Sequence, residues 1–221
     1  MAHTKRYKRL NQELCEQAVK ECFKGKWRRN DILTFVEKYA GIPRDDIRID
    51  DLSGTRKYKN EAIKAIGLVM LGIVEDLVDY GIEPDDMEPV VIRQRPDGMT
   101  GKIRDIALLC IMHQLLGHIT KRILEPLIQA RLFPTQHASI PGHGQTMLKD
   151  QMRRYLLKES LGIEYIRKTD VVHAYASLQY AVCIRLVKTE IPKAKYAIRL
   201  LEYLETIAPD GHLIIGGYLD A

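Results

Sequence analysis

Apolar residues recur at the spacing of an α-helix along most of the chain, and the pattern is strongest between Leu109 and Ile128. The apolar positions of this segment are Ile111, Leu115, Leu116, Ile119, Ile123 and Leu127. Further helices are predicted over residues 59–80, 178–187 and 192–207, and another is expected to end at Lys158. The chain is therefore predicted to be an α+β protein dominated by helices.

Two β-like runs, residues 88–95 and 101–106, flank the turn sequence Pro96-Asp-Gly-Met-Thr100. They predict an antiparallel hairpin. Lys102 and Arg104 are two residues apart, so we expect them on one face of the second strand. Two cations on one strand face make a fixed anion clamp, in which Arg supplies the bidentate contact. The alternative is an exposed hairpin whose charges interact only with solvent.

Positive charge is concentrated at the beginning of the chain. Of its 221 residues, the first 30 hold nine Lys or Arg against three Glu, whereas the whole chain has a net charge of +5. The cations considered for nucleic-acid binding are Lys5, Arg6, Lys8, Arg9, Lys26, Arg28 and Arg29. They flank an amphipathic segment, and such a basic arm suits phosphate backbones. The alternative is a solvated helix face.

The sequence offers no sign of a membrane span, and an anionic membrane is a weaker alternative to nucleic acid as the partner of the basic arm, because the apolar face of the arm is modest. Its longest apolar run, from Ala65 to Val74, is about half the length that a membrane span needs. The first residues, Met1-Ala-His-Thr-Lys-Arg6, lack the apolar core of a signal peptide. We therefore expect a cytoplasmic protein.

Residues that often bind metals do not form a recognisable ligand pattern. The cysteines (Cys15, Cys22, Cys110 and Cys183) include no Cys-x-x-Cys pair, and reduced, buried thiols are expected. The paired carboxylates Asp45-Asp46 and Asp50-Asp51 lack the spacing of an EF-hand and its closing Glu. They are predicted to be helix caps and loop residues.

One carboxylate lies between a predicted strand and a predicted helix. Residues 162–166 are short, apolar and partly β-branched, as in a buried strand. Asp170 follows them, and helical spacing begins at Leu178. Open α/β folds bind ligands at strand ends. An Asp in this position is also a common helix N-cap or turn former.

The sequence Asp170-Val-x-x-Ala-Tyr-x-Ser177, with Lys168 two residues before it, resembles the first catalytic motif of reverse transcriptases. The resemblance implies that Asp170 and the backbone carbonyl of Val171 bind the Mg²⁺ ions of nucleotidyl transfer. It also implies that Tyr175 lies under the incoming sugar and discriminates against a 2′-hydroxyl. Carboxylate oxygens are ligands that Mg²⁺ prefers.

Other features follow in the order found in reverse transcriptases of bacterial mobile elements. Lys102 and Arg104 resemble the basic residues of the fingers hairpin that grip the dNTP, and the helix with Gln114 and Leu-Glu-Pro126 follows. Next come Ser139 and Gly142-His-Gly144, then the catalytic motif, and last an Ile-Gly-Gly sequence. The last motif implies that Gly216 and Gly217 support the template and the nascent pair. Three positions depart from the family pattern: His143 for Arg, His212 for Gly and Asp220 for Ser.

The resemblance, which covers residues 88–221, implies an N-terminal part of an RNA-directed DNA polymerase that binds RNA template, nascent DNA, dNTP and Mg²⁺. Residues 1–87 would be a basic helical region, 88–161 the fingers and 162–221 the start of the palm, with a small sheet of residues 162–170 and 213–217. The aromatic-x-Asp-Asp motif is absent from these residues, so we expect no polymerisation by this chain alone. The alternative is a non-enzymatic, helical RNA- or DNA-binding module.

Overall fold

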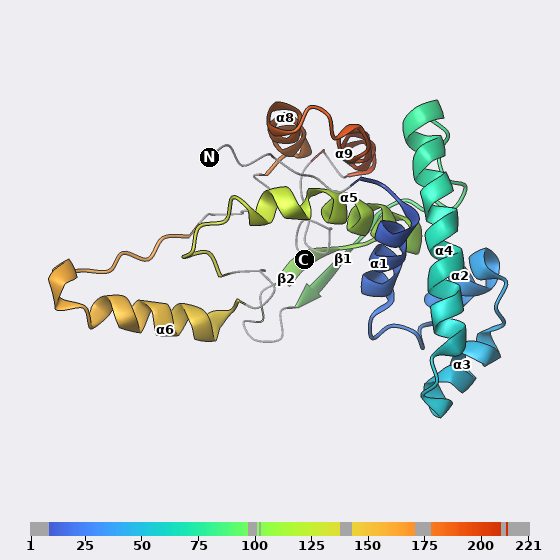
Figure 1. Cartoon of the computed structure of the whole chain (residues 1–221), viewed down its shortest axis with the longest axis horizontal. Coiled ribbons are helices and arrows are strands. Elements are labelled where there is room, and N and C mark those ends of the chain that lie inside the picture. The colour runs from blue at the N-terminus through green and yellow to red at the C-terminus, as the bar shows by residue number, and fades with distance from the viewer. Residues whose placement is uncertain are drawn as a thin grey trace.

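The computed structural model is mostly helical and contains a two-stranded antiparallel sheet, which confirms the predicted α+β class (Figure 1). The structure describes residues 9–96, 101, 103–137, 143–170, 178–208 and 211. Its α-helices are α1 (Gln12–Phe23), α2 (Asn30–Ala40), α3 (Arg44–Ser53), α4 (Lys57–Glu75), α5 (Ile111–Gln129), α6 (Gln145–Leu156), α8 (Tyr180–Glu190) and α9 (Lys195–Ile207). A π-helical turn, Asp76–Tyr80, extends α4, and a 3-10 turn, Glu159–Leu161, follows α6.

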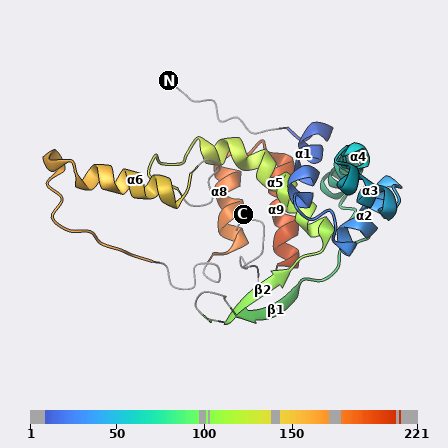
Figure 2. The ribbon, with the colours of Figure 1, turned by 90° about the horizontal axis from the view of Figure 1, so that it is seen from below.

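The helix with the strongest sequence pattern, α5, lies at the centre of the fold (Figure 2). Both α1 and α9 pack against it. Its apolar face is buried along its length, at Ile111, Met112, Leu115, Leu116, Ile119, Ile123, Leu124 and Leu127. The half-buried guanidinium of Arg122 also joins α5 to α1, because it donates to Glu21 Oε2 at 3.0 Å and to Gln17 Oε1 at 3.2 Å. Apolar burial and a charged bridge thus fix α1 on α5.

One hydrophobic cluster contains residues from α1 to α5 and from α8 and α9. The three segments predicted as basic region, fingers and palm therefore share a core, and their limits at residues 87 and 161 stay predictions. The two longest helices, α4 and α5, both turn apolar faces into this cluster. Among the described residues, no helix has both the length and the apolarity required to cross a lipid bilayer.

A side chain of the preceding helix, α3, caps the first turn of α4. Arg56, at the N-cap position, has a φ of +56° and makes no side-chain cap. The buried carboxylate of Asp50, from α3, accepts instead from the Lys59 N–H at 2.8 Å and from Thr55 Oγ1 at 3.1 Å. This pairing satisfies a helix donor that would otherwise be unpaired. The capping role predicted for these acidic residues is confirmed at Asp50.

Close packing of α1 on α4 depends on a glycine. A Cβ at Gly67 would lie 2.6 Å from Glu16 Cγ, 3.0 Å from Glu16 N and 3.1 Å from Glu16 Cα. Because two of these atoms belong to the backbone of α1, rotation of the Glu16 side chain cannot remove the conflict. Gly72, on the same helix, has no atom within 4 Å of the corresponding position.

We expect Gly67→Ala to lower the free energy of unfolding by about 1–3 kcal/mol, because overpacking forces α1 and α4 apart. Gly72→Ala is the matched control on the same helix. It should raise stability by about 0.5–1 kcal/mol, because Ala restricts the unfolded chain and favours the helix. Urea denaturation of the two variants measures both changes. Equal effects in both variants would contradict the close approach at Gly67.

The predicted hairpin is present. Strand β1 (Val91–Pro96) pairs antiparallel with β2 (Ile103–Leu108), with Val91 opposite Leu108 and Arg95 opposite Arg104. Both strands begin slightly later than the sequence indicated. Figure 2 shows the hairpin projecting away from the end of α5 that it joins. The antiparallel pairing on which the clamp prediction depended is therefore confirmed.

Residues 162–170 do not form the buried strand predicted for this segment. Their apolar side chains are exposed, by 45% at Ile163, 84% at Tyr165 and 61% at Ile166. Within the described residues no strand pairs with them. They follow α6, which extends away from the core (Figure 1) and has no buried residue. The composition of residues 162–166 is typical of a strand, but a strand also needs a neighbouring strand for its backbone hydrogen bonds, and composition does not indicate whether one is present. The other predicted strand, 213–217, lies outside the described residues.

Candidate nucleic-acid interface

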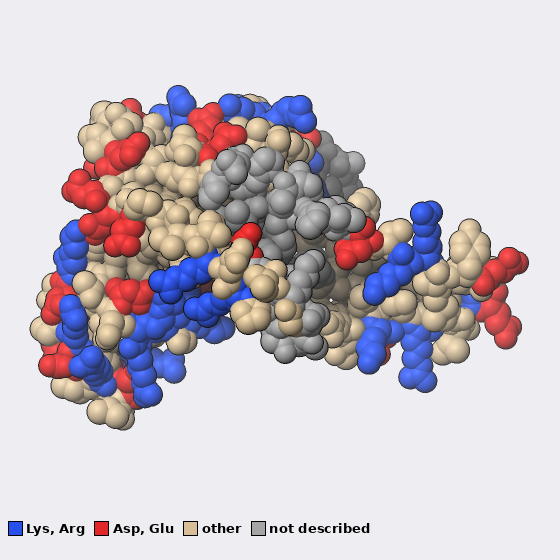
Figure 3. All heavy atoms as spheres, turned by 180° about the vertical axis from the view of Figure 1, so that it is seen from behind, with Lys and Arg blue, Asp and Glu red and all other residues tan. Residues whose placement is uncertain are grey.

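A cleft of about 900 Å³ lies between the N-terminal helices and the base of the hairpin. One wall comes from α2 and the residues between α1 and α2, and the other from β1 and the beginning of α5. Its cationic residues are Lys26, Arg29, Lys38 and Arg93. Its carboxylates are Asp31, Asp86 and Glu88. Figure 3 shows the molecule from behind, with many Lys and Arg side chains, and Asp and Glu side chains among them, on the side where the N-terminal helices lie.

The cleft also has an apolar surface. Val91 is 50% exposed, and the half-buried Leu108 and Leu109 lie beside it in the lining. Behind them Phe35 and Met112 are buried. The cleft therefore offers hydrophobic contact area between charged walls, a combination typical of ligand sites in proteins.

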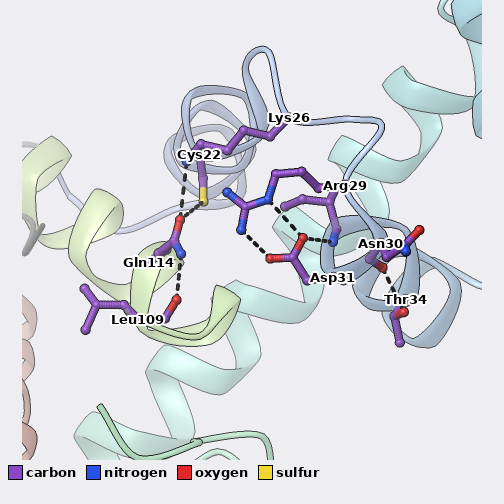
Figure 4. A network of polar contacts seen from close by, with 9 residues as sticks. Cys22, Lys26, Arg29, Asn30, Asp31, Thr34, Leu109 and Gln114 are labelled. Carbon is purple, nitrogen blue, oxygen red and sulfur yellow. Dashed lines mark hydrogen bonds and ion pairs between the residues drawn. The ribbon is translucent and has the colours of Figure 1, made fainter. Parts of the chain in front are cut away.

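The side chain of Lys26 is held across the cleft by Gln114, as Figure 4 shows. Lys26 Nζ donates to Gln114 Oε1 at 3.3 Å, and Cys22 Sγ lies 3.9 Å from the same oxygen. The Gln114 amide in turn donates to the carbonyl of Leu109 at 2.7 Å. This chain of contacts connects α1 to the start of α5. Among the described residues, Lys26 has no carboxylate partner, so its charge is not neutralised by an ion pair.

Arg29 is paired within its own wall. Its guanidinium makes two contacts with Asp31, one of them from Nε to Oδ1 at 3.0 Å (Figure 4). Partial burial alone would raise the pKa of Asp31. The hydrogen bond and charge of Arg29, together with the Ile32 N–H, outweigh burial and hold the pKa below its usual value. Asp31 is therefore ionised at neutral pH and neutralises Arg29.

A second ion pair joins two of the segments that line the cleft. Lys38 Nζ lies 2.5 Å from Asp86 Oδ1, and the Tyr39 hydroxyl donates to Asp86 Oδ2 at 2.6 Å. Hydrogen bonds from Lys38 and then Tyr39 lower the pKa of Asp86. Burial, followed by the hydrogen bond to Asp86, raises the pKa of Tyr39. These contacts fix α2 to the segment that leads into β1.

The hairpin contributes further cations. Arg93 is exposed and lines the cleft, and Arg95 follows two residues later on the same strand. The register puts Arg104 directly opposite Arg95 in the ladder. Lys102 and the side chain of Arg104 lie outside the described part of the chain, so of the predicted Lys-x-Arg clamp only the backbone position of Arg104 is located. The ladder thus brings three arginine positions of the hairpin close together.

The structure divides the basic residues that the sequence grouped at the N-terminus. Lys26 and Arg29 line the cleft. Arg28 pairs with Asp51, from Nε to Oδ2 at 3.1 Å. Arg9 lies near the opposite end of α1, in a cleft of about 300 Å³ that it shares with Lys193 and other residues. The remaining cations of this group, Lys5, Arg6 and Lys8, lie outside the described residues.

The predicted catalytic residues are only partly located. Asp170 is exposed and lies in a segment, residues 162–170, to which no helix or strand is assigned. Val171, Tyr175, Gly216 and Gly217 lie outside the described residues. In the described part of the chain, no group of three or more His, Cys, Asp or Glu residues is arranged to hold a metal ion. Asp170 is thus the single located member of the predicted Mg²⁺ site, and that site stays a prediction.

Two residues of the cleft carried no separate signal in the sequence. Lys38 lies on the polar side of an ordinary amphipathic helix, and nothing in its neighbours distinguishes it. Arg93 belongs to a run whose pattern indicates only a strand. Their position in the cleft depends on packing between distant segments, which a local pattern does not encode.

Comparison of the sequence with protein-family models and with curated proteins found no match. The resemblance to reverse transcriptases therefore depends on the motifs and on their order along the chain.

Proposed function

We propose that this chain is the fingers region and the beginning of the palm of an RNA-directed DNA polymerase. The observation that carries the proposal is the antiparallel hairpin, whose register brings Arg93, Arg95 and Arg104 together beside a cationic cleft. A paired ladder restricts the backbone, so the positions from which these arginines extend are fixed before phosphate binds. The order of the family motifs along the sequence supports the same function.

In this function Lys102 and Arg104 hold the phosphates of the dNTP and of the nucleic acid. Asp170 and the Val171 carbonyl would hold Mg²⁺, which stabilises negative charge on the reacting phosphate when it is bound. Exposure of Asp170 agrees with a side chain that binds a ligand from solvent. Tyr175 would discriminate against ribonucleotides.

The second candidate function is a non-enzymatic, helical RNA- or DNA-binding module. The cleft beside the N-terminal helices favours this candidate, because the described residues of its lining combine cations with apolar side chains and do not include Asp170. Both functions require nucleic-acid binding, and they differ in their requirement for Asp170.

We expect the chain to bind an RNA–DNA hybrid with an affinity that falls steeply as salt increases. Lys102→Ala/Arg104→Ala should reduce the slope of log K against log salt by about 2, since each lost phosphate contact contributes about 0.9. The matched control is Lys20→Ala/Lys64→Ala, which removes two exposed charges from α1 and α4. Fluorescence anisotropy with a labelled hybrid measures the slopes. Binding independent of salt would contradict both candidate functions, and an unchanged slope in the hairpin variant would contradict the clamp.

A further inference from the structure

We propose that the cleft between the N-terminal helices and the hairpin is a binding groove for a single strand of nucleic acid. Lys26 and Arg93 would contact its phosphates, and Val91, Leu108 and Leu109 would contact its bases. The inference rests on the proposed function, since both require nucleic-acid binding. It adds a site whose proposed contact residues lie outside the motifs, and it gives a role to the N-terminal helices.

The charges of the cleft are not equivalent. Arg29 is neutralised by Asp31, and Lys38 is neutralised by Asp86. Lys26 contacts the neutral amide of Gln114, and Arg93 has no ion pair with any described residue. The exposed carboxylate of Glu88 also lines the cleft without such a pair, so four cations face three carboxylates and the net charge of the described lining is +1. Lys26 and Arg93 stand on opposite walls, one after α1 and the other on β1. A phosphate chain that passes between them can meet a charge from each side.

The apolar surface favours a single strand over a duplex. In a duplex the bases are paired inside and the outside presents mainly phosphate and sugar, so apolar side chains gain little from it. The bases of a single strand are unpaired, so apolar side chains can make van der Waals contact with them while cations follow the backbone. The exposed Val91 and the half-buried Leu108 and Leu109 supply such a surface next to Arg93.

The two walls are already connected before any ligand binds. The Lys38–Asp86–Tyr39 contacts join α2 to the segment before β1, and the contact of Lys26 with Gln114 joins the end of α1 to α5. The groove is therefore set in place by protein contacts. Preorganisation of this kind reduces the entropy lost on binding.

The test uses the full 221-residue chain, a labelled single-stranded RNA of about 12 nucleotides and a blunt RNA–DNA hybrid of the same sequence. We expect Lys26→Ala/Arg93→Ala to bind the single strand roughly tenfold more weakly, with a salt slope reduced by about 1.4. Its affinity for the hybrid should fall less than its affinity for the single strand, because Arg93 belongs to the hairpin that contacts both ligands, whereas Lys26 lies only in the groove. Lys20→Ala/Lys64→Ala should leave both affinities unchanged.

Lys26→Arg/Arg93→Lys keeps both charges and should retain single-strand binding. If the alanine variant does not fold, judged by circular dichroism, Lys26→Gln/Arg93→Gln replaces it because Gln keeps a polar side chain. Wild-type affinity for the single strand in the folded variant would overturn the groove. Equal losses for the single strand and the hybrid would overturn the preference for a single strand.

The result also separates the two proposals. A wild-type chain that binds the hybrid through Lys102 and Arg104 but does not bind the single strand overturns the groove and leaves the proposed function standing. Single-strand binding that depends on Lys26 and Arg93, with no effect of the hairpin variant on the hybrid, supports the groove and contradicts the clamp. A chain that binds neither probe contradicts both.

Discussion

The folded protein is expected to lose about 3 kcal/mol of its free energy of unfolding between about pH 6.5 and pH 4 because of His113. This side chain is 2% exposed on the buried face of α5. Burial lowers its pKa to about 4. Its Nδ1 lies 3.5 Å from Cys110 Sγ, and its Nε2 has no hydrogen-bond partner among the described residues. The surroundings therefore do not stabilise a charged ring.

The sign of this pH dependence follows from the number of protons that the folded and unfolded states bind. In the unfolded chain the imidazole takes up a proton near pH 6.5, whereas in the folded protein it does so only near pH 4. Between these values the unfolded state binds more protons, so lower pH favours unfolding. The contribution of His113 is fully present above about pH 6.5 and is lost as the pH falls toward 4.

Urea denaturation at a series of pH values measures this effect in wild type and in His113→Leu. The variant removes the titrating group, so its stability should fall less between pH 6.5 and pH 4. The quantity compared is the slope of the free energy of unfolding against pH, so a change in stability at neutral pH caused by the substitution itself does not affect the comparison. His143→Gln, at an exposed histidine, is the control and should keep the wild-type slope. Parallel curves for wild type and His113→Leu would contradict a buried, neutral His113.

Elements whose signals are local were predictable from the sequence. The apolar pattern of α5 spans five turns, so its position as a buried helix followed directly from periodicity. The hairpin was predictable because the Asp97-Gly98 turn sequence lies between two β-like runs. Both predictions required only residues close to one another in the chain.

The cleft was not predictable in the same way. Lys26 and Gln114 are 88 positions apart, and Lys38 and Asp86 are 48 positions apart. They meet because α1 and α2 pack with α4 and α5 in one core. The local sequence places Lys26 in a basic segment but does not indicate that its side chain contacts Gln114 at the start of α5.

The error at residues 162–166 has a related cause. An apolar, β-branched run forms a strand when another strand satisfies its backbone N–H and C=O groups. The sequence contains no local sign of that partner. Asp170 lies in the most specific motif of the sequence, and an activity assay on its Asn variant tests whether it binds metal.

Asp170→Asn is expected to reduce Mg²⁺-dependent DNA synthesis on an RNA template by roughly 10³-fold or more, because the loss of a metal ligand removes several kcal/mol of transition-state stabilisation. Asn keeps the size and hydrogen bonding of Asp but lacks the negative charge that binds the metal ions. Tyr175→Ala should retain part of the activity and incorporate ribonucleotides more readily. Asp150→Asn, which changes an exposed carboxylate on α6, is the matched control and should leave synthesis unchanged.

The deciding measurement is primer extension on an RNA template with Mg²⁺ and dNTPs. It compares wild type with Asp170→Asn in the protein encoded by the whole reading frame that contains these 221 residues. A reverse transcriptase that uses Asp170 as a metal ligand predicts extension by wild type and by Asp150→Asn, and almost none by Asp170→Asn. Equal extension by wild type and Asp170→Asn would show that Asp170 is only a turn residue and would contradict the proposed function.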